Sequence, residues 1–283
     1  MCRDEHPRSS KSSKARQGFR SQWQVSGVIL SVVIITHNEE ANIGRTLASV
    51  QPLVADGNGE IIVVDSVSTD RTVEIAKSFG TKVFVETWKG YAAQKNSAID
   101  KATGDWILSL DADEEVESDL VKEISIAISE QQRLAGYWMA RKNFFLGCRI
   151  KRGGFWPDWK LRLFRRGAGL FEDRAVHEDV QVQGLTAKLH GALLHHSYPT
   201  LSDYIDHMNR YSSLGAEMVV AKNYRGFSLY NIVLRPLATF IHNYFLRLGF
   251  LDGREGLLLH LYHAVYVSWK YAKAWEQSRN DRR

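Results

Sequence analysis

The hydrophobic residues of the N-terminal half fall into two alternating patterns. Short continuous apolar runs predict buried strands, at residues 28–35, 61–64 and 82–85 and in the run that ends at Leu110. Between and after these runs, apolar residues recur every three or four positions and predict helices at residues 41–50, 72–79, 91–102 and 120–130. Strands that alternate with helices of this length indicate βαβ units and a mainly parallel sheet.

The pattern changes after residue 130. Three more strands are expected at Gly136–Arg141, Trp159–Phe164 and Ala187–His195, and the chain becomes helical from Leu201 onward. We therefore expect an α/β fold with a Rossmann-like, mainly parallel sheet flanked by helices and a C-terminal helical appendage. The expected divisions are a tail at residues 1–25, an α/β domain at 26–200 and a helical segment at 201–283.

Polar residues cluster where three of the expected parallel strands end, at Thr36–Glu39, Asp65–Asp70 and Asp111–Asp113. Ligands of open α/β sheets bind outside the carboxyl ends of the strands, so this edge is the expected binding edge. The chain has no glycine-rich phosphate loop of the GxGxxG or GxxxxGK[ST] type. A dinucleotide oxidoreductase or a P-loop NTPase is therefore disfavoured, and bound phosphates must be held by metal and cationic side chains.

The acidic cluster at Asp111, Asp113, Glu114 and Glu115 has two interpretations. Neighbouring carboxylates repel one another unless a cation or ligand hydroxyls neutralise them. Oxygen ligands suit Mg²⁺ or Mn²⁺, which proteins often share with substrate phosphates. The alternative is a solvated acidic loop that opens the next helix, where acids favour the first turn.

Composition and charge indicate the cellular compartment and the order of the N-terminal tail. The 283 residues are 44% hydrophobic, and six basic and two acidic residues in the first 20 supply +4 of the net charge of +5. This Ser-rich tail is expected to be disordered, and either to touch anionic lipid or nucleic acid or to have no role. Only Cys2 and Cys148 are present, and the polar N-terminus lacks a secretory apolar region. Both features favour a reducing, cytoplasmic setting.

Four segments in order, SVVIITHNEEANI, VVDSVSTDRTVEIA, GYAAQKNSAI and WILSLDADEEV, resemble the family 2 glycosyltransferases of the GT-A fold. The later WPDWKLRLFRR and AVHEDV resemble a bacterial branch that includes the lipopolysaccharide core β-1,4-glucosyltransferases. The resemblance covers residues 28–200. Val67 stands where that family usually has glycine, which is costly if the position needs a positive φ.

The resemblance implies a nucleotide-sugar site along the strand ends. It places Thr36, Asn38 and Glu39 near the ribose and base, although the same residues could simply begin a helix. The other implied donor contacts are Asp65 and Ser66 at the base, Gln94 and Lys95 at the diphosphate, and Asp111 at the ribose. Asp113, with Asp111 as a second ligand, is the implied metal site.

Inverting sugar transfer needs a general base that takes the proton of the acceptor hydroxyl. The resemblance favours Glu178 as this base, with Asp179 as the second choice. Trp156, Asp158 and Arg162 are the expected acceptor or phosphate contacts, because aromatic rings stack on sugars and Arg binds phosphate. The pair His195-His196 is expected to be structural rather than metal-binding.

The helical tail lacks a membrane span by sequence, since its longest uncharged run, Gly256–Trp269, has 14 residues against the roughly 20 that a span needs. An apolar stripe at residues 258, 261, 262, 265 and 269 beside basic residues suggests a helix lying on an anionic membrane surface. Packing on the catalytic domain or on a second subunit is the alternative.

Together these features predict a metal-dependent inverting transferase on the inner face of the plasma membrane, with Mg²⁺ or Mn²⁺ as cofactor. Its expected donor is a UDP-hexose, its acceptor a lipopolysaccharide-core or other lipid-linked saccharide, and no nucleic acid is involved. The alternatives are a polyprenyl-phosphate sugar synthase, whose acceptor phosphate needs no base, and a non-catalytic sugar-nucleotide-binding protein.

Overall fold

The computed structural model describes residues 30–55, 57–130, 133–172, 180–222 and 227–280. The expected disordered tail at residues 1–25 lies outside these ranges. The proposed division at residues 200 and 201 stays a prediction, although the long helix α5 does begin at Leu201.

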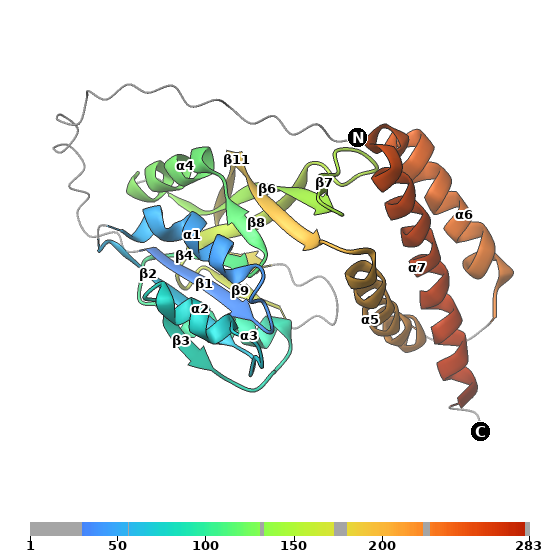
Figure 1. The fold of residues 1–283 in the computed structure, drawn as a ribbon, viewed down its shortest axis with the longest axis horizontal. Helices are drawn as coiled ribbons and strands as arrows, with labels where there is room; N and C mark the ends of the chain where they lie inside the picture. Colours follow the sequence, from blue (N-terminus) through green and yellow to red (C-terminus); the bar gives the residue numbers. More distant parts are fainter. Residues whose placement is uncertain (1–29, 56, 131–132, 173–179, 223–226, 281–283) are drawn as a thin grey trace.

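Four parallel strands form the first half of the main sheet (Figure 1). They lie in the order β3-β2-β1-β4 and comprise β1 (Leu30–Thr36), β2 (Gly59–Asp65), β3 (Lys82–Val85) and β4 (Trp106–Asp111). The helices are α1 (Ile43–Val54), α2 (Thr72–Ser78), α3 (Tyr91–Asp100) and α4 (Ser118–Ser129). One apolar cluster joins α1, α2 and α4 to one face of the sheet, and a second joins α3 to the other face. The expected doubly covered α/β sheet is confirmed.

The second half of the sheet is mixed. It continues as β8 (Asp158–Arg165), β6 (Leu134–Phe145), β11 (Leu185–Tyr198) and β5 (Glu114–Val116), with β7 (Cys148–Arg149) paired to β6. Strand β8 is antiparallel to both β4 and β6, while β11 is parallel to β6. A separate hairpin pairs β9 (Gly169–Phe171) with β10 (Val180–Val182). Because β5 pairs with β11, the acidic segment after β4 lies beside a strand about 80 residues later in the chain.

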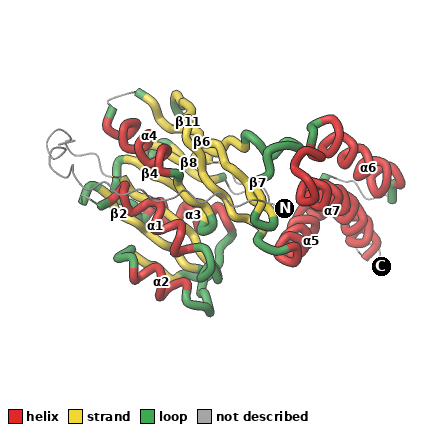
Figure 2. The backbone as a smooth tube through the Cα atoms, turned by 45° about the horizontal axis from the view of Figure 1, so that its top comes forward, coloured by secondary structure: helices red, strands yellow, loops and turns green. Residues whose placement is uncertain are grey.

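The C-terminal helices stack beside the sheet (Figures 1 and 2). They are α5 (Leu201–Ala221), the π-helical turn η1 (Tyr230–Leu234), α6 (Arg235–Phe240), the π-helical turn η2 (Ile241–Leu246), the 3₁₀ turn η3 (Gly249–Asp252) and α7 (Gly253–Asn280). Helix α7 lies between α5 and α6, so α6 is the outermost helix. Within the described ranges, no helix combines the length and the hydropathy that crossing a membrane requires.

The structure bears on two alternatives that the sequence left open. The acidic segment at 114–116 is not a solvated loop but forms β5, in which Glu114 and Val116 are buried. The apolar stripe on α7 packs in part on the rest of the chain, since Leu258 and Tyr262 contact the buried cluster of Phe145, Tyr204 and Leu259. The large exposed apolar side chains of this region lie mostly on the preceding helices, from Phe227 to Leu251.

Candidate functional site

The carboxyl ends of β1, β2 and β4 bring three of the predicted site residues to one edge of the sheet. Thr36 is opposite Asp65 in the β1–β2 register, and Ile35 is opposite Asp111 in the β1–β4 register. The Thr36 hydroxyl donates a hydrogen bond of 2.9 Å to Asp65 Oδ1, and Asp65 is completely buried. The site edge therefore forms directly from strand alignment, as the apolar runs predicted.

The loop that follows β2 is held by the same carboxylate. The Ser68 amide donates to Asp65 Oδ2 at 2.8 Å, and the Asn38 side-chain carbonyl accepts from the Thr69 amide at 2.8 Å. Val67 has a φ of 59° and is 52% exposed, so a β-branched side chain does occupy the left-handed conformation that glycine suits. Ser66 is buried, and its hydroxyl has no hydrogen-bond partner among the described residues.

Helix α3 directs a cation toward the end of β4. The Lys95 ammonium lies 2.8 Å from Asp111 Oδ1, and its side chain is only 8% exposed. The neighbouring Gln94 is completely buried, and neither atom of its amide group finds a partner within the described ranges. An unsatisfied buried amide is costly, so Gln94 is available to hydrogen-bond a ligand.

Two buried arginines complete an ion-pair network around β4 and β5. Arg162 of β8 contacts both Asp111 Oδ2 and Glu114 Oε1, while Arg141 of β6 lies 3.1 Å from Glu114 Oε1. Burial opposes ionisation of Asp111, but the charges of Arg162 and Lys95 outweigh it and hold the pKa of this carboxyl well below its usual range. Burial likewise opposes the charge of Arg162, yet Asp111 and Glu114 raise the pKa of its guanidinium. Asp111 therefore stays an anion whose two oxygens each face a cation.

The network extends to one more predicted residue. Asp158 accepts hydrogen bonds from Arg141 Nη2 at 2.6 Å and Arg141 Nε at 2.8 Å. Trp156 is instead covered by the Arg149 guanidinium, 4.7 Å from the ring centroid, and is 36% exposed. Asp158 and Arg162 thus hold neighbouring charges in place, and their expected contacts with acceptor or phosphate stay predictions.

Asp113 has a different partner from Asp111. His195 Nε2 of β11 lies 3.4 Å from Asp113 Oδ2, while His195 Nδ1 is 2.7 Å from the Asn143 side-chain oxygen. Burial would raise the pKa of Asp113, but the interaction with His195 lowers it overall. The Asn143 contact fixes the orientation of the His195 ring. His195 therefore belongs to the site, although no spacing of residues along the chain indicated it.

Metal binding at this point can be judged from the donor atoms. No group of three or more potential metal ligands occurs among the described residues. Asp113 and His195 supply one carboxylate and one imidazole. Mg²⁺ commonly binds one or two carboxylates and completes its shell with water and substrate phosphates. The donor set therefore fits a divalent cation shared with a phosphate-bearing ligand, centred on Asp113.

Glu39 lies at the same edge with its carboxylate held by Asn42 Nδ2 at 2.8 Å. Burial, together with the negative charges of Asp113, Asp70 and Asp111, raises the pKa of Glu39 to about 7, against the lowering effect of the Asn42 bond. A cation or a ligand hydroxyl next to these acids would stabilise the ionised form.

The two base candidates, Glu178 and Asp179, lie outside the described residues. The site also includes Glu114, Arg141 and His195, which sequence reasoning did not assign. Glu114 stood in the recognised acidic motif, and its complete burial separates it from its neighbours. Arg141 and His195 come from strands 30 and 84 residues beyond Asp111, so only the sheet register brings them to the site.

Comparisons with known proteins support the fold described above. Residues 31–182 match the family model described as Glycosyl transferase family 2. An uncharacterized glycosyltransferase of Rickettsia typhi is 33% identical over 265 residues, covering 89% of each chain. The lipopolysaccharide core biosynthesis glycosyltransferase LpsC of Rhizobium meliloti is 29% identical over 88% of this chain and 92% of its own.

Among solved structures, the chain is similar to the mannosyltransferase PcManGT from Pyrobaculum calidifontis, determined in complex with GDP-Man and Mn²⁺. The TM-score is 0.53, the identity is 14%, and the match covers 88% of this chain and 87% of the other. This likeness supports the expected fold, including its C-terminal helices.

Proposed function

Because the chain belongs to glycosyl transferase family 2, we propose that it transfers a hexose from a nucleoside diphosphate sugar to a saccharide hydroxyl, with inversion at the anomeric carbon. The observation that carries this proposal is the pair of differently partnered carboxylates at the end of β4. Asp111 is neutralised by Lys95 and Arg162, whereas Asp113 faces only His195 among its close ionic partners in the described residues.

This difference separates the expected roles of the two acids. Asp113, with His195, would hold Mg²⁺ or Mn²⁺, and the similar mannosyltransferase was solved with Mn²⁺. When bound, the cation offsets the negative charge that develops on the leaving nucleoside diphosphate. Asp111 has both oxygens occupied by cations, so its proposed role is to contact the ribose and to hold Lys95 in place.

The remaining donor contacts follow the edge of the sheet. Lys95 and the unpaired amide of Gln94 are proposed to bind the diphosphate. Thr36, Asn38 and Glu39 are proposed to lie along the ribose and base, and the free hydroxyl of Ser66 is available to the base. Asp65 already accepts bonds from Thr36 and Ser68, so a nucleobase N–H would be an additional donor to it.

On the acceptor side, Glu178 is the proposed general base and Asp179 the second candidate. Trp156, which is 36% exposed beside the Arg149 guanidinium, is the proposed sugar-stacking residue. The likeness to LpsC supports a lipopolysaccharide-core or other lipid-linked saccharide as acceptor. The proposed donor is a UDP-hexose. Such an acceptor would place the protein peripherally on the inner face of the plasma membrane.

A donor screen followed by base variants tests the proposal. Purified protein with Mn²⁺ or Mg²⁺ is incubated with UDP- and GDP-hexoses, and released nucleoside diphosphate is measured with and without saccharide acceptor. Glu178→Gln should lower turnover by roughly 10²–10⁴-fold without weakening donor binding. A healthy Glu178→Gln and an inactive Asp179→Asn would assign the base to Asp179.

Two further outcomes identify the alternatives. Full transfer to a polyprenyl phosphate by both variants would identify a polyprenyl-phosphate sugar synthase, whose acceptor needs no base. Donor binding without any hydrolysis or transfer, across all donors and both metals, would identify a sugar-nucleotide-binding protein and refute the proposed activity.

A further inference from the structure

The outermost helical layer exposes an apolar face. Apart from the adjacent pair Val233 and Leu234, its residues recur every three or four positions, and each is between 43% and 57% exposed: Tyr230, Val233, Leu234, Leu237, Ile241 and Phe245. We call this set the outer face. The spacing places the side chains on one side of the continuous η1–α6–η2 helix. Contiguous exposed apolar surface of this kind marks an interaction site in a soluble protein.

No described element covers the outer face. Helix α7 contacts α6, and α5 lies beyond α7 (Figures 1 and 2), while the side chains of the outer face stay about half exposed. Residues 227–250 carry two arginines and one histidine but no acidic residue. The residues of this segment that can carry charge are therefore all basic.

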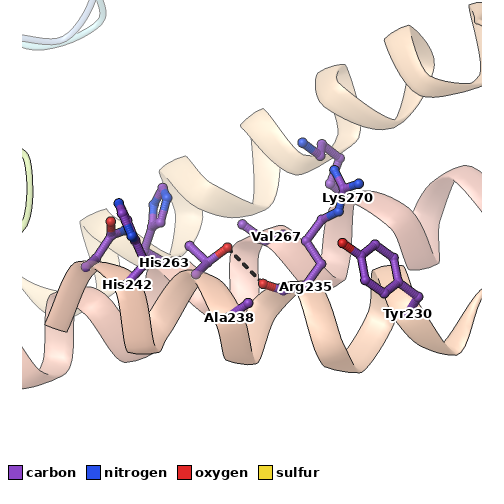
Figure 3. A pocket seen from close by; sticks show the side chains of 9 residues that line it. Tyr230, Arg235, Ala238, His242, His263, Val267 and Lys270 are labelled. Carbon is purple, nitrogen blue, oxygen red and sulfur yellow. Dashed lines mark hydrogen bonds between the residues drawn. The ribbon is translucent and has the colours of Figure 1, made fainter. Parts of the chain in front are cut away.

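A basic pocket lies beside the outer face, between α6 and α7 (Figure 3). Its volume is about 540 Å³. The lining residues are Tyr230, Arg235, Ala238, Thr239, His242, Asn243, His263, Val267 and Lys270. Four of these nine side chains can carry positive charge and none can carry negative charge. Tyr230 belongs to both the pocket and the outer face.

The charges in this pocket are unbalanced. In Figure 3 the side chains of Arg235 and Lys270 extend toward each other. Burial and the charge of Arg235 lower the pKa of Lys270. Neither cation has a carboxylate partner in the part of the chain that the structure describes; Arg235 Nη1 instead donates to the Tyr271 hydroxyl at 2.7 Å. An anion between the two would remove their mutual repulsion.

The histidines adjust the pocket further. Burial, with the nearby His260 and Lys270, lowers the pKa of His263 to about 4, so its imidazole is neutral near pH 7. A neutral imidazole can donate one hydrogen bond without adding to the repulsion. The pocket thus presents the cations of Arg235 and Lys270 and a further hydrogen-bond donor in Asn243, a donor set that suits a phosphate group.

We propose that this pocket binds the phosphate of an anionic phospholipid headgroup while the outer face lies in the interfacial region of the bilayer. This binding rests on the proposed function, whose lipid-linked acceptor places the protein on a membrane; the outer face and the pocket would be the surface that contacts the lipid. A second copy of the chain is a poorer occupant, because a symmetric contact would set one basic surface against another. An anionic bilayer matches both the apolar face and the positive pocket.

Vesicle sedimentation of the full chain tests the proposal. Phosphatidylcholine vesicles with and without phosphatidylglycerol are compared, at low and high salt, for wild type and three variants. Arg235→Gln with Lys270→Gln removes the pocket charges, and Leu237→Gln with Phe245→Gln removes apolar area from the outer face. Lys77→Gln with Lys122→Gln removes two exposed cations from α2 and α4 as a matched control.

We expect the pocket variant to bind phosphatidylglycerol vesicles about 30-fold more weakly than wild type, at about 1 kcal/mol per lost cation. Its weak binding to phosphatidylcholine alone should equal that of wild type. The outer-face variant should lose binding to both vesicles, and the control should match wild type. High salt should reduce only the phosphatidylglycerol-dependent part.

Several results would overturn the inference. Wild type that ignores both vesicles, or a pocket variant that binds like the control, excludes the lipid phosphate. Stabilisation by inorganic phosphate that depends on Arg235 and Lys270, without vesicle binding, assigns the pocket to a soluble anion. A dimer by light scattering that the outer-face variant abolishes assigns that face to a second copy.

Folding and the transferase activity are monitored separately. Each variant is checked by thermal unfolding and by hydrolysis of the donor in solution, which should stay at the wild-type level. Vesicle binding as expected, with no donor hydrolysis by any protein, would refute the proposed function and leave the membrane surface standing. Donor hydrolysis without vesicle binding would refute the membrane surface and leave the proposed function standing.

Discussion

Replacement of Glu39 by Gln should make the protein more stable at neutral pH but not in acid. The Glu39 carboxylate lies partly buried near Asp113, Asp70 and Asp111, and its pKa is raised from 4.5 to about 7 by burial first and then by these charges. Gln has nearly the same shape and keeps an oxygen that can accept from Asn42 Nδ2. The substitution therefore removes the buried charge and little else.

The sign follows from proton binding. The folded state has the higher pKa, so between pH 4.5 and about 7 it binds more protons at Glu39 than the unfolded state does. The free energy of unfolding therefore falls as the pH rises through this window and is constant above it. At roughly 1.4 kcal/mol for each unit of pH, the loss is on the order of 3 kcal/mol. For a chain of this size that corresponds to about 5–10 °C in Tm.

Thermal unfolding measures this effect. It is done in chelator, because a bound cation would itself lower the pKa of Glu39. The difference in Tm between Glu39→Gln and wild type should be small at pH 4.5, grow up to pH 7 and stay constant at pH 8. Glu74→Gln, at an exposed position of α2, is the control and should show no such trend. An equal difference at pH 4.5 and pH 8 would refute the argument that Glu39 is buried beside like charges.

Three other substitutions test separate parts of the site. Asp113→Asn should abolish sugar transfer and also the rise in Tm that Mn²⁺ causes, while the Tm of the variant in chelator stays close to that of wild type. Full activity of the variant, or activity of the wild type in excess chelator, would exclude metal binding at Asp113. Arg162→Met should lower the free energy of unfolding by about 3 kcal/mol in urea, because two buried carboxylates lose a shared partner; an unchanged midpoint would contradict the network. Val67→Gly should raise the free energy of unfolding by roughly 0.5–1 kcal/mol, because the strain of a left-handed valine that is relieved exceeds the cost of the extra entropy of the unfolded chain. A lower free energy of unfolding would mean that the half-exposed Val67 side chain contributes packing that glycine loses.

The parallel half of the fold could be predicted because its signals are local. Each apolar run forms a strand on its own, and parallel alignment then brings Thr36, Asp65 and Asp111 to one edge. The balance of charge at that edge could not be predicted in the same way. Arg141 and Arg162 reach Asp111 only because β8 pairs antiparallel with β4 and β6 pairs antiparallel with β8, a register that no local pattern specifies.

Two features of the sequence did not specify their surroundings in the fold, for identifiable reasons. His195 had no metal-ligand spacing along the chain, because its partner Asp113 is contributed by the β4–β5 turn, which the β5–β11 pairing brings close. The stripe on α7 has the periodicity of a surface helix, but the same periodicity serves a helix that packs between α5 and α6. Periodicity identifies an apolar face without identifying what covers it.

The short connection between β11 and α5 holds the helical segment at a fixed distance from the site. Strand β11 carries His195 and ends at Tyr198, and after two residues α5 begins, with Thr200 and Asp203 forming a capping box at its start. Only two residues separate β11 from α5, and the 21 residues of α5 span about 30 Å. With the outer face on a bilayer, the reacting centre would stand at one height above the lipid. The enzyme would then favour acceptors in which the saccharide between the lipid and the reacting hydroxyl has one particular length.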